Sequence, residues 1–270
     1  MKLTMLGTGN ALVTECYNTC FVLEQNGKYL LVDAGGGNQV LYQLKAAGYN
    51  WMDMKDIFVT HKHLDHIMGV FWMMRMILQY SNEGTYPGEA TIYGHDQVID
   101  LLTEISAKLL KKKEIALIGK KLHLVTLRDG QEFEVLGEKA RAFDIQSTKA
   151  KQFGFSLTWP CDGDCKKKLT CCGDEPYKDC EKLYAQGSDW LLHEAFCLYD
   201  DRDRFHPYEK HHSTVKDAAE LAEELGVKNL ILYNTEDSDL AHRKERYLAE
   251  AGRYYHGHAY VPDDLESIEL

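Results

Sequence analysis

A run of histidine and aspartate residues constrains this chain more than any other feature. His61, His63, Asp65 and His66 come directly after an apolar segment at residues 56–59. In an extended segment alternate side chains share one face, so His61 and His63 can converge on one point. The chain must then turn, which directs Asp65 and His66 toward a second point. Imidazole nitrogen and carboxylate oxygen are donors that zinc, iron and manganese accept, so the run predicts ligands for two adjacent metal ions.

A surface strand that merely ends in histidines is the alternative interpretation of this run. Metal sites require His, Asp or Glu at short fixed offsets, and the run supplies those offsets. We therefore interpret it as part of a metal site.

Composition is that of a soluble globular protein. The 270 residues are 44% hydrophobic and 27% charged, which is ordinary for this class. No apolar run approaches the ~20 residues that cross a bilayer. The first residues contain one lysine and reach Gly7 too soon for a signal peptide. We therefore expect a cytoplasmic protein with no membrane partner.

The charge balance argues against a polyanionic partner. The formal net charge is −11, from 42 acidic and 31 basic side chains. An acidic balance weakens long-range attraction to tRNA or DNA. Short lysine runs at 111–113 and 120–121 are more simply explained as solvated helix ends. Nucleic acid is therefore not an expected partner.

The eight cysteines are expected to be buried or free thiols. Without a secretory signal they have no reason to form a disulfide framework. A structural zinc site in the cluster at 161–172 is the alternative, but the spacing lacks paired C-x-x-C motifs. The cysteines are Cys16, Cys20, Cys161, Cys165, Cys171, Cys172, Cys180 and Cys197.

Strand and helix patterns alternate in both halves of the chain. Period-two and short apolar segments predict strands at 2–6, 19–24, 29–33, 56–59, 90–93, 122–126, 132–135, 140–145, 153–158, 168–172, 189–192, 228–233 and 258–261. Longer segments predict helices at 39–47, 67–80, 95–110, 214–225 and 238–251. This order favours an α/β fold of two packed sheets with helices outside, built as a single domain over residues 1–270.

Four further motifs, together with the histidine run, resemble the metallo-β-lactamase superfamily. Within it, the chain is most similar to the branch of ribonuclease Z and related phosphodiesterases. The motifs are LGTGNA at 6–11, CGD at 172–174, LHEAF at 192–196 and HST at 212–214. Their order and spacing span nearly the whole chain. The resemblance implies the αββα sandwich of that superfamily, with two mixed sheets between helices.

The resemblance also implies a divalent metal cofactor of up to two ions, zinc or alternatively manganese or iron. His61 and His63 would bind one ion, Asp65 and His66 the other, and Asp174 would bridge them. A metal-bound hydroxide would be the nucleophile of a hydrolase.

Three further roles follow from the same resemblance. Asp65 would orient the hydroxide, and His212 paired with Glu194 would donate a proton to the leaving oxygen. Asp33 would position a ligand histidine from outside the metal's own ligands. The alternatives are that Asp33 only stabilises the glycine turn at 35–37, and that Glu194 is an ordinary buried acid.

Two positions depart from the family pattern. Gln146 and Asn234 stand where the family has metal-binding histidines. An amide oxygen is a harder and weaker donor than imidazole and favours manganese, iron or magnesium relative to zinc. Gln146 has the reach to coordinate directly, whereas Asn234 would fall short or act through water. We therefore expect weakened metal affinity, most of all at the Asp65/His66 position, and do not expect His242 to substitute.

The interval between Gln146 and Asp174 has no room for the long tRNA-binding arm of ribonuclease Z. A small-molecule phosphodiester, such as a cyclic nucleotide or an alkyl or phosphonate-type diester, is the expected substrate. Side chains that line its pocket or pack the loop are Tyr199, Phe205, His206 and Tyr208. Homodimers are common in the family, so a homodimer is consistent with the resemblance.

Two other functions compete with a phosphodiesterase. The amides Gln146 and Asn234 favour a degenerate family member that binds a ligand without cleaving it. A lactonase or thioesterase is a further alternative, because a metal hydroxide also attacks carbonyl carbon. The intact pair of His212 and Glu194 favours the enzyme.

Overall fold

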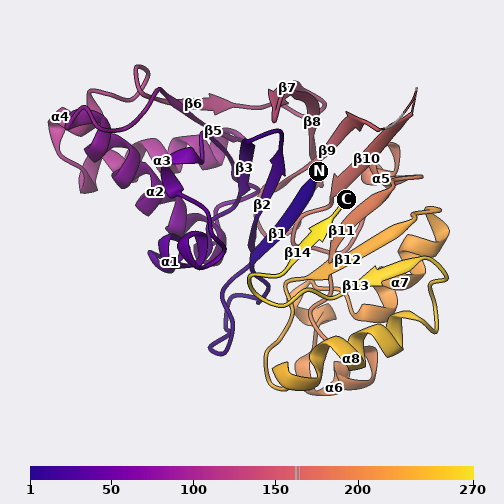
Figure 1. The fold of residues 1–270 in the computed structure, drawn as a ribbon. Helices are drawn as coiled ribbons and strands as arrows, with labels where there is room; N and C mark the ends of the chain where they lie inside the picture. Colours follow the sequence, from indigo (N-terminus) through magenta and orange to yellow (C-terminus); the bar gives the residue numbers. More distant parts are fainter. Residues whose placement is uncertain (162, 164) are drawn as a thin grey trace.

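Two seven-stranded sheets form the centre of the computed structural model, which describes residues 1–161, 163 and 165–270. Figure 1 shows them side by side, with helices on the outer flanks. The amino and carboxyl ends of the chain lie close together, since Lys2 pairs with Glu269.

The first sheet has the order β14-β1-β2-β3-β4-β5-β6. Neighbours from β14 to β3 are antiparallel, whereas those from β3 to β6 are parallel. The strands are β1 (Lys2–Gly7), β2 (Cys20–Gln25), β3 (Lys28–Val32), β4 (Asp56–Phe58), β5 (Ala90–Gly94), β6 (Leu122–Thr126) and β14 (Ser267–Glu269).

The second sheet has the order β13-β12-β11-β10-β9-β8-β7. It repeats the pattern of the first, because β7 to β10 are antiparallel neighbours and β10 to β13 are parallel. The strands are β7 (Glu132–Val135), β8 (Glu138–Asp144), β9 (Phe153–Pro160), β10 (Lys166–Cys171), β11 (Trp190–Glu194), β12 (Asn229–Tyr233) and β13 (His258–Tyr260).

The helices follow the same division. The first half contributes α1 (Gln39–Ala46), α2 (Leu64–Asn82), α3 (Asp96–Leu109), α4 (Lys112–Ile115) and the 3-10 turn η1 (Trp51–Asp53). The second contributes α5 (Lys182–Ala185), α6 (Arg202–Phe205), α7 (Val215–Glu224), α8 (Leu240–Ala251) and the 3-10 turns η2 (Asp179–Glu181), η3 (Tyr199–Asp201) and η4 (Tyr208–Lys210). In the described part of the chain, no helix has both the length and the apolarity needed to cross a membrane.

Three hydrophobic clusters hold these layers together. The central cluster joins the two sheets, for example through Phe58 and Phe155, whose ring centroids are 5.1 Å apart. A second cluster packs α1, α2 and α3 on the first sheet, and a third packs α7 and α8 on the second. Four layers of helix, sheet, sheet and helix result, which confirms the predicted αββα sandwich.

The predicted strands and helices are all present, with ends that differ by a few residues. The additional elements are short: β14, α4, α5, α6 and the 3-10 turns. β14 has three residues, and it depends on pairing with β1 from the other end of the chain. Local sequence patterns carry no signal for such a strand.

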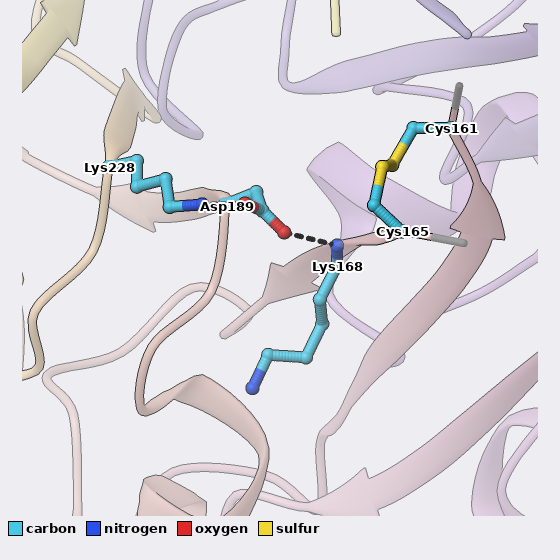
Figure 2. The surroundings of a disulfide bond; sticks show 5 residues. All are labelled: Cys161, Cys165, Lys168, Asp189 and Lys228. Atoms are coloured by element: carbon cyan, nitrogen blue, oxygen red, sulfur yellow. Dashed lines mark hydrogen bonds and ion pairs between the residues drawn. A yellow bond between two sulfur atoms is a disulfide. The ribbon is translucent and has the colours of Figure 1, made fainter. Parts of the chain in front are cut away.

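The expectation of free or buried thiols was wrong for one pair of cysteines. Cys161 and Cys165 form a disulfide with a Cα–Cα distance of 5.4 Å (Figure 2). The hairpin of β9 and β10 brings them together, because Cys161 N–H donates to the Cys165 carbonyl. Cys171 and Cys172 lie at the opposite end of β10, about 20 Å along the strand. These four cysteines therefore do not form one structural zinc site. Asp162 and Asp164 of this cluster lie outside the described residues.

Helix α2 packs unusually close to the turn that follows β3. Gly69 N–H donates to the Gly35 carbonyl at 2.9 Å, and Ala34 N–H donates to the His66 carbonyl at 3.0 Å. A Cβ atom on Gly69 would lie 1.8 Å from the Ala34 carbonyl oxygen. Only glycine therefore permits this contact, which fixes α2 and its histidine against the first sheet.

Gly69→Ala should lower the free energy of unfolding by about 2 kcal/mol, because the helix must move away from the turn. The gain in helix propensity, about 1 kcal/mol, opposes this loss but is smaller. Urea denaturation measures the change. Arg75→Ala, at an exposed position of the same helix, is the matched control and should have little effect. Equal stability of Gly69→Ala and the natural chain would contradict the close contact.

Candidate metal centre

The site lies where the carboxyl ends of strands from both sheets meet. Asp33 follows β3, the run 60–66 follows β4, and Asp174 follows β10. Glu194 ends β11 and Asn234 follows β12. Open parallel sheets commonly bind ligands at this edge.

Asp33 organises two of the histidines. It is 3% exposed and adopts a left-handed backbone with φ 54°. Its carboxylate accepts from Thr60 N–H at 2.8 Å, from the Thr60 hydroxyl at 2.7 Å and from His66 Nδ1 at 2.7 Å. A carboxylate only accepts. The proton on this side of His66 therefore sits on Nδ1, which leaves Nε2 to face the centre.

Thr60 fixes the tautomer of His61 in the same way. Its hydroxyl oxygen lies 2.9 Å from His61 Nδ1, and its single proton is donated to Asp33. His61 Nδ1 must therefore be the donor, and the lone pair of His61 is on Nε2. Burial, followed by repulsion from His66 and His63, holds the pKa of His61 well below its ordinary value. A neutral imidazole with a fixed Nε2 lone pair is the form that binds a metal.

The predicted ligands converge in space. Potential ligand atoms lie within 4.8 Å of one another in three groups: Asp33, His61 and His66; His61, His63 and Asp174; and Asp65, His66 and Asp174. Asp174 Oδ2 is 3.7 Å from His61 Nε2 and 3.4 Å from His66 Nε2. It belongs to both of the groups expected to hold an ion, as a bridging carboxylate would.

The charges in this cluster suit a cation. Burial by itself raises the pKa of Asp65, but His66 outweighs burial and lowers it to about 2. Burial likewise opposes a charge on His66, yet Asp65 and Asp33 raise its pKa well above the ordinary value. His66 Nε2 lies 3.3 Å from Asp65 Oδ2 and 3.4 Å from Asp174 Oδ2. Carboxylates that favour a positive charge at this point form a centre that fits a divalent metal ion.

His212 and Glu194 form a separate pair beside the cluster. His212 Nδ1 lies 3.4 Å from Glu194 Oε2, and Glu194 is fully buried. The other carboxylate oxygen accepts from Ser213 N–H. Burial lowers the pKa of His212, but the hydrogen bond and charge of Glu194 outweigh it and raise that pKa. The His212 ring also stacks on Phe196, with centroids 5.0 Å apart.

The side-chain amide nitrogen of Asn234 faces the cluster of predicted metal ligands. Its Nδ2 donates to Asp174 Oδ1, and its Oδ1 accepts from the Thr19 hydroxyl at 3.2 Å. The amide oxygen, the atom that could bind a metal, is therefore directed to Thr19. In this orientation Asn234 ties down Asp174 instead of adding a ligand.

The two other residues considered for this role lie elsewhere. Gln146 is exposed, has φ 55° and is outside the residues that line the pocket. His242 on α8 is exposed and pairs with Asp239 at 2.8 Å.

A cavity of about 380 Å³ opens beside the cluster. It is lined by Asn10, Ala11, Leu12, His63, Leu64, Asp65, Lys149, Asp174, Phe196, Lys210, His212 and Asn234. Of the two alternatives for Tyr199, Phe205, His206 and Tyr208, the structure favours loop packing, because none of the four is among these lining residues. Phe205 packs against Phe196, and Tyr208 donates to Asp217. Thr60, Lys149 and Lys210 were not predicted; Thr60 stands in the run itself, but single lysines carry no sequence signal.

The family of this chain is decided by comparison with known proteins. The model of the family described as "Anti-Pycsar protein Apyc1" matches residues 1–254. The chain belongs to this family. It is also 26% identical to a ribonuclease Z of Brevibacillus brevis over 321 aligned positions, which cover 100% of this chain and 97% of that protein.

Solved structures agree on the fold. The metallo-β-lactamase fold protein YhfI of Bacillus subtilis has a TM-score of 0.76 at 19% identity, covering 100% of this chain and 99% of its own. A diphosphatase of the PhnP family has a TM-score of 0.73 at 16% identity, with 100% and 96% covered. This member of the Apyc1 family thus has the metallo-β-lactamase fold and is similar in sequence to ribonuclease Z, as the motifs predicted.

Asn234→His should tighten zinc binding at the weaker position by about tenfold, because imidazole replaces an amide turned away from the ion. Calorimetric titration of metal-free protein measures the affinity. His242→Asn, which removes an exposed histidine on the neighbouring helix, should leave both affinity and stoichiometry unchanged. If Asn234→His binds zinc no better than the natural chain, position 234 is not directed at the metal.

Proposed function

We propose that this protein is a metal-dependent hydrolase that cleaves a small phosphodiester, such as a cyclic nucleotide. The observation that carries the proposal is the convergence of the ligand atoms of His61, His63, Asp65, His66 and Asp174. The ribonuclease Z relative and the PhnP-family diphosphatase support cleavage of a phosphate ester or anhydride.

The cluster would hold one or two divalent ions at His61, His63 and Asp174 and at Asp65, His66 and Asp174. When bound, such an ion supplies positive charge for the phosphate and lowers the pKa of a water molecule. Asp65, with its low pKa, remains ionised and can accept a hydrogen bond from the attacking water.

His212 is the residue best placed to protonate the leaving oxygen. Its Nδ1 side faces Glu194, and its Nε2 side faces the cavity near Lys149. The buried Glu194 carboxylate favours the protonated ring and keeps it oriented. General acid catalysis of this kind contributes roughly 10²–10⁴-fold to a rate.

A small substrate fits the cavity and the chain length. About 380 Å³ is within the usual range for a small-molecule site. The alignment with ribonuclease Z runs over 321 positions against 270 residues here, so that relative has segments this chain lacks. Together with the net charge of −11, this favours a compact anion over tRNA.

A ligand-binding protein without catalysis is the second candidate. The orientation of Asn234 toward Asp174 and the exposure of Gln146 favour it, since both weaken the metal site. The buried Glu194 beside His212 favours the enzyme, because a binding protein has no use for a proton donor.

Hydrolysis assays with added manganese, iron or zinc separate the candidates. The natural chain should cleave cyclic nucleotides or an aryl phosphodiester, and Asp65→Asn should lower kcat at least a hundredfold. A natural chain inactive with all three metals, and active only as Gln146→His/Asn234→His, would support the binding protein instead.

The dependence on pH tests the proton donor. If protonated His212 is the active form, the rate falls as pH rises through its pKa. Glu194→Gln removes the charge that raises this pKa, so the fall should move to lower pH. Glu250→Gln removes another buried carboxylate, one that accepts from Tyr199 N–H, and should leave the profile unchanged. An unmoved profile in Glu194→Gln would exclude this role.

A further inference from the structure

Two lysines line the cavity without an acidic partner. Lys149 and Lys210 both line it, and neither forms an ion pair with a carboxylate of the described residues. Their neighbours behave differently, since Lys151 pairs with Asp96 at 2.7 Å and Lys178 with Glu175 at 3.4 Å. Unpaired cations beside a ligand cavity indicate an anion that is brought by the ligand.

The position of Lys149 is specific. Its Nζ donates to the Lys210 carbonyl at 3.1 Å and lies 3.4 Å from His212 Nε2. An ammonium has three N–H donors and no acceptor, so its donors exceed the acceptors that surround it. The remaining donor capacity lies beside the imidazole that faces the cavity.

The loop that carries Lys149 is held in place by a buried acid. Glu175 is 2% exposed and accepts from the Ser147 hydroxyl, from Thr148 N–H at 3.2 Å and from Lys149 N–H at 3.3 Å. The Ser147 hydroxyl oxygen in turn accepts from Ala150 N–H at 3.2 Å. The backbone at Lys149 is therefore fixed, which reduces the entropy lost when its ammonium binds a ligand.

We propose that Lys149 binds a non-bridging oxygen of the substrate phosphate beside His212, with Lys210 adding positive charge at the same rim. The inference rests on the proposed function, which supplies the phosphodiester. It assigns to this chain a phosphate contact that does not depend on the metal ligands.

The same charge has a second effect of opposite sign. The Lys149 side chain lines the same cavity as the expected metal ligands His63, Asp65 and Asp174. Its ammonium must therefore repel a metal ion bound at those residues. Removing the ammonium should therefore weaken phosphate binding and leave metal binding equal or tighter. A residue that merely supports the loop would weaken both.

Calorimetric titration with inorganic phosphate, on protein loaded with manganese, tests the proposal without turnover. Lys149→Met should weaken phosphate binding by about tenfold or more, the usual effect of losing a charge-assisted hydrogen bond. Lys149→Arg should retain most of the affinity, because the charge and donors remain. Lys151→Met, whose ammonium pairs with Asp96, is the matched control and should bind phosphate like the natural chain.

Manganese titration of the same variants completes the test. Equal or tighter manganese binding in Lys149→Met, with weakened phosphate binding, supports the contact. Unchanged phosphate binding, or a parallel loss of manganese and phosphate binding, overturns it. Hydrolysis is assayed separately. If the natural chain is inactive but Lys149→Met still weakens phosphate binding without weakening manganese binding, the proposed function is contradicted and the contact is not. An active chain with unchanged phosphate binding contradicts only the contact.

Discussion

The buried carboxylate of Asp33 is the interaction on which the site depends. It accepts from Thr60 twice and from His66 once, and Thr60 passes the constraint on to His61. A buried charge of this kind is tolerated only when its acceptor sites are used. One acid at the end of β3 thereby sets the orientation of two imidazoles that follow β4. The alternative role, support of the glycine turn alone, does not account for these three contacts.

The second half of the chain completes and also limits the centre. Asp174 and the pair of His212 and Glu194 come from the second sheet and its loops, so the site exists only where the two sheets meet. Asn234 binds Asp174 through its nitrogen, which restrains a carboxylate without supplying a ligand. Lys149 adds a cation at the rim.

Much of this could be predicted from the sequence, for a physical reason. The ligands at 61–66 stand at fixed offsets in one segment, and strand and helix periods are local, so both are visible without tertiary information. The orientation of the Asn234 amide, the reach of Lys149 and the pairing of β14 with β1 depend on segments far apart in the sequence. The Cys161–Cys165 bond depends on the pairing of β9 with β10, whereas the expectation of free thiols rested on the absence of a secretory signal.

Titration of metal-free protein with manganese or zinc, comparing the natural chain with Asp33→Asn, tests the central claim most directly. An amide can still accept from Thr60, but it cannot balance the charge on His66 or fix its ring as a carboxylate does. The account predicts metal affinity 10–100-fold weaker in Asp33→Asn, the usual cost of losing such support, with the fold retained by circular dichroism. Equal affinity in the two proteins, or no metal binding by the natural chain, would contradict it.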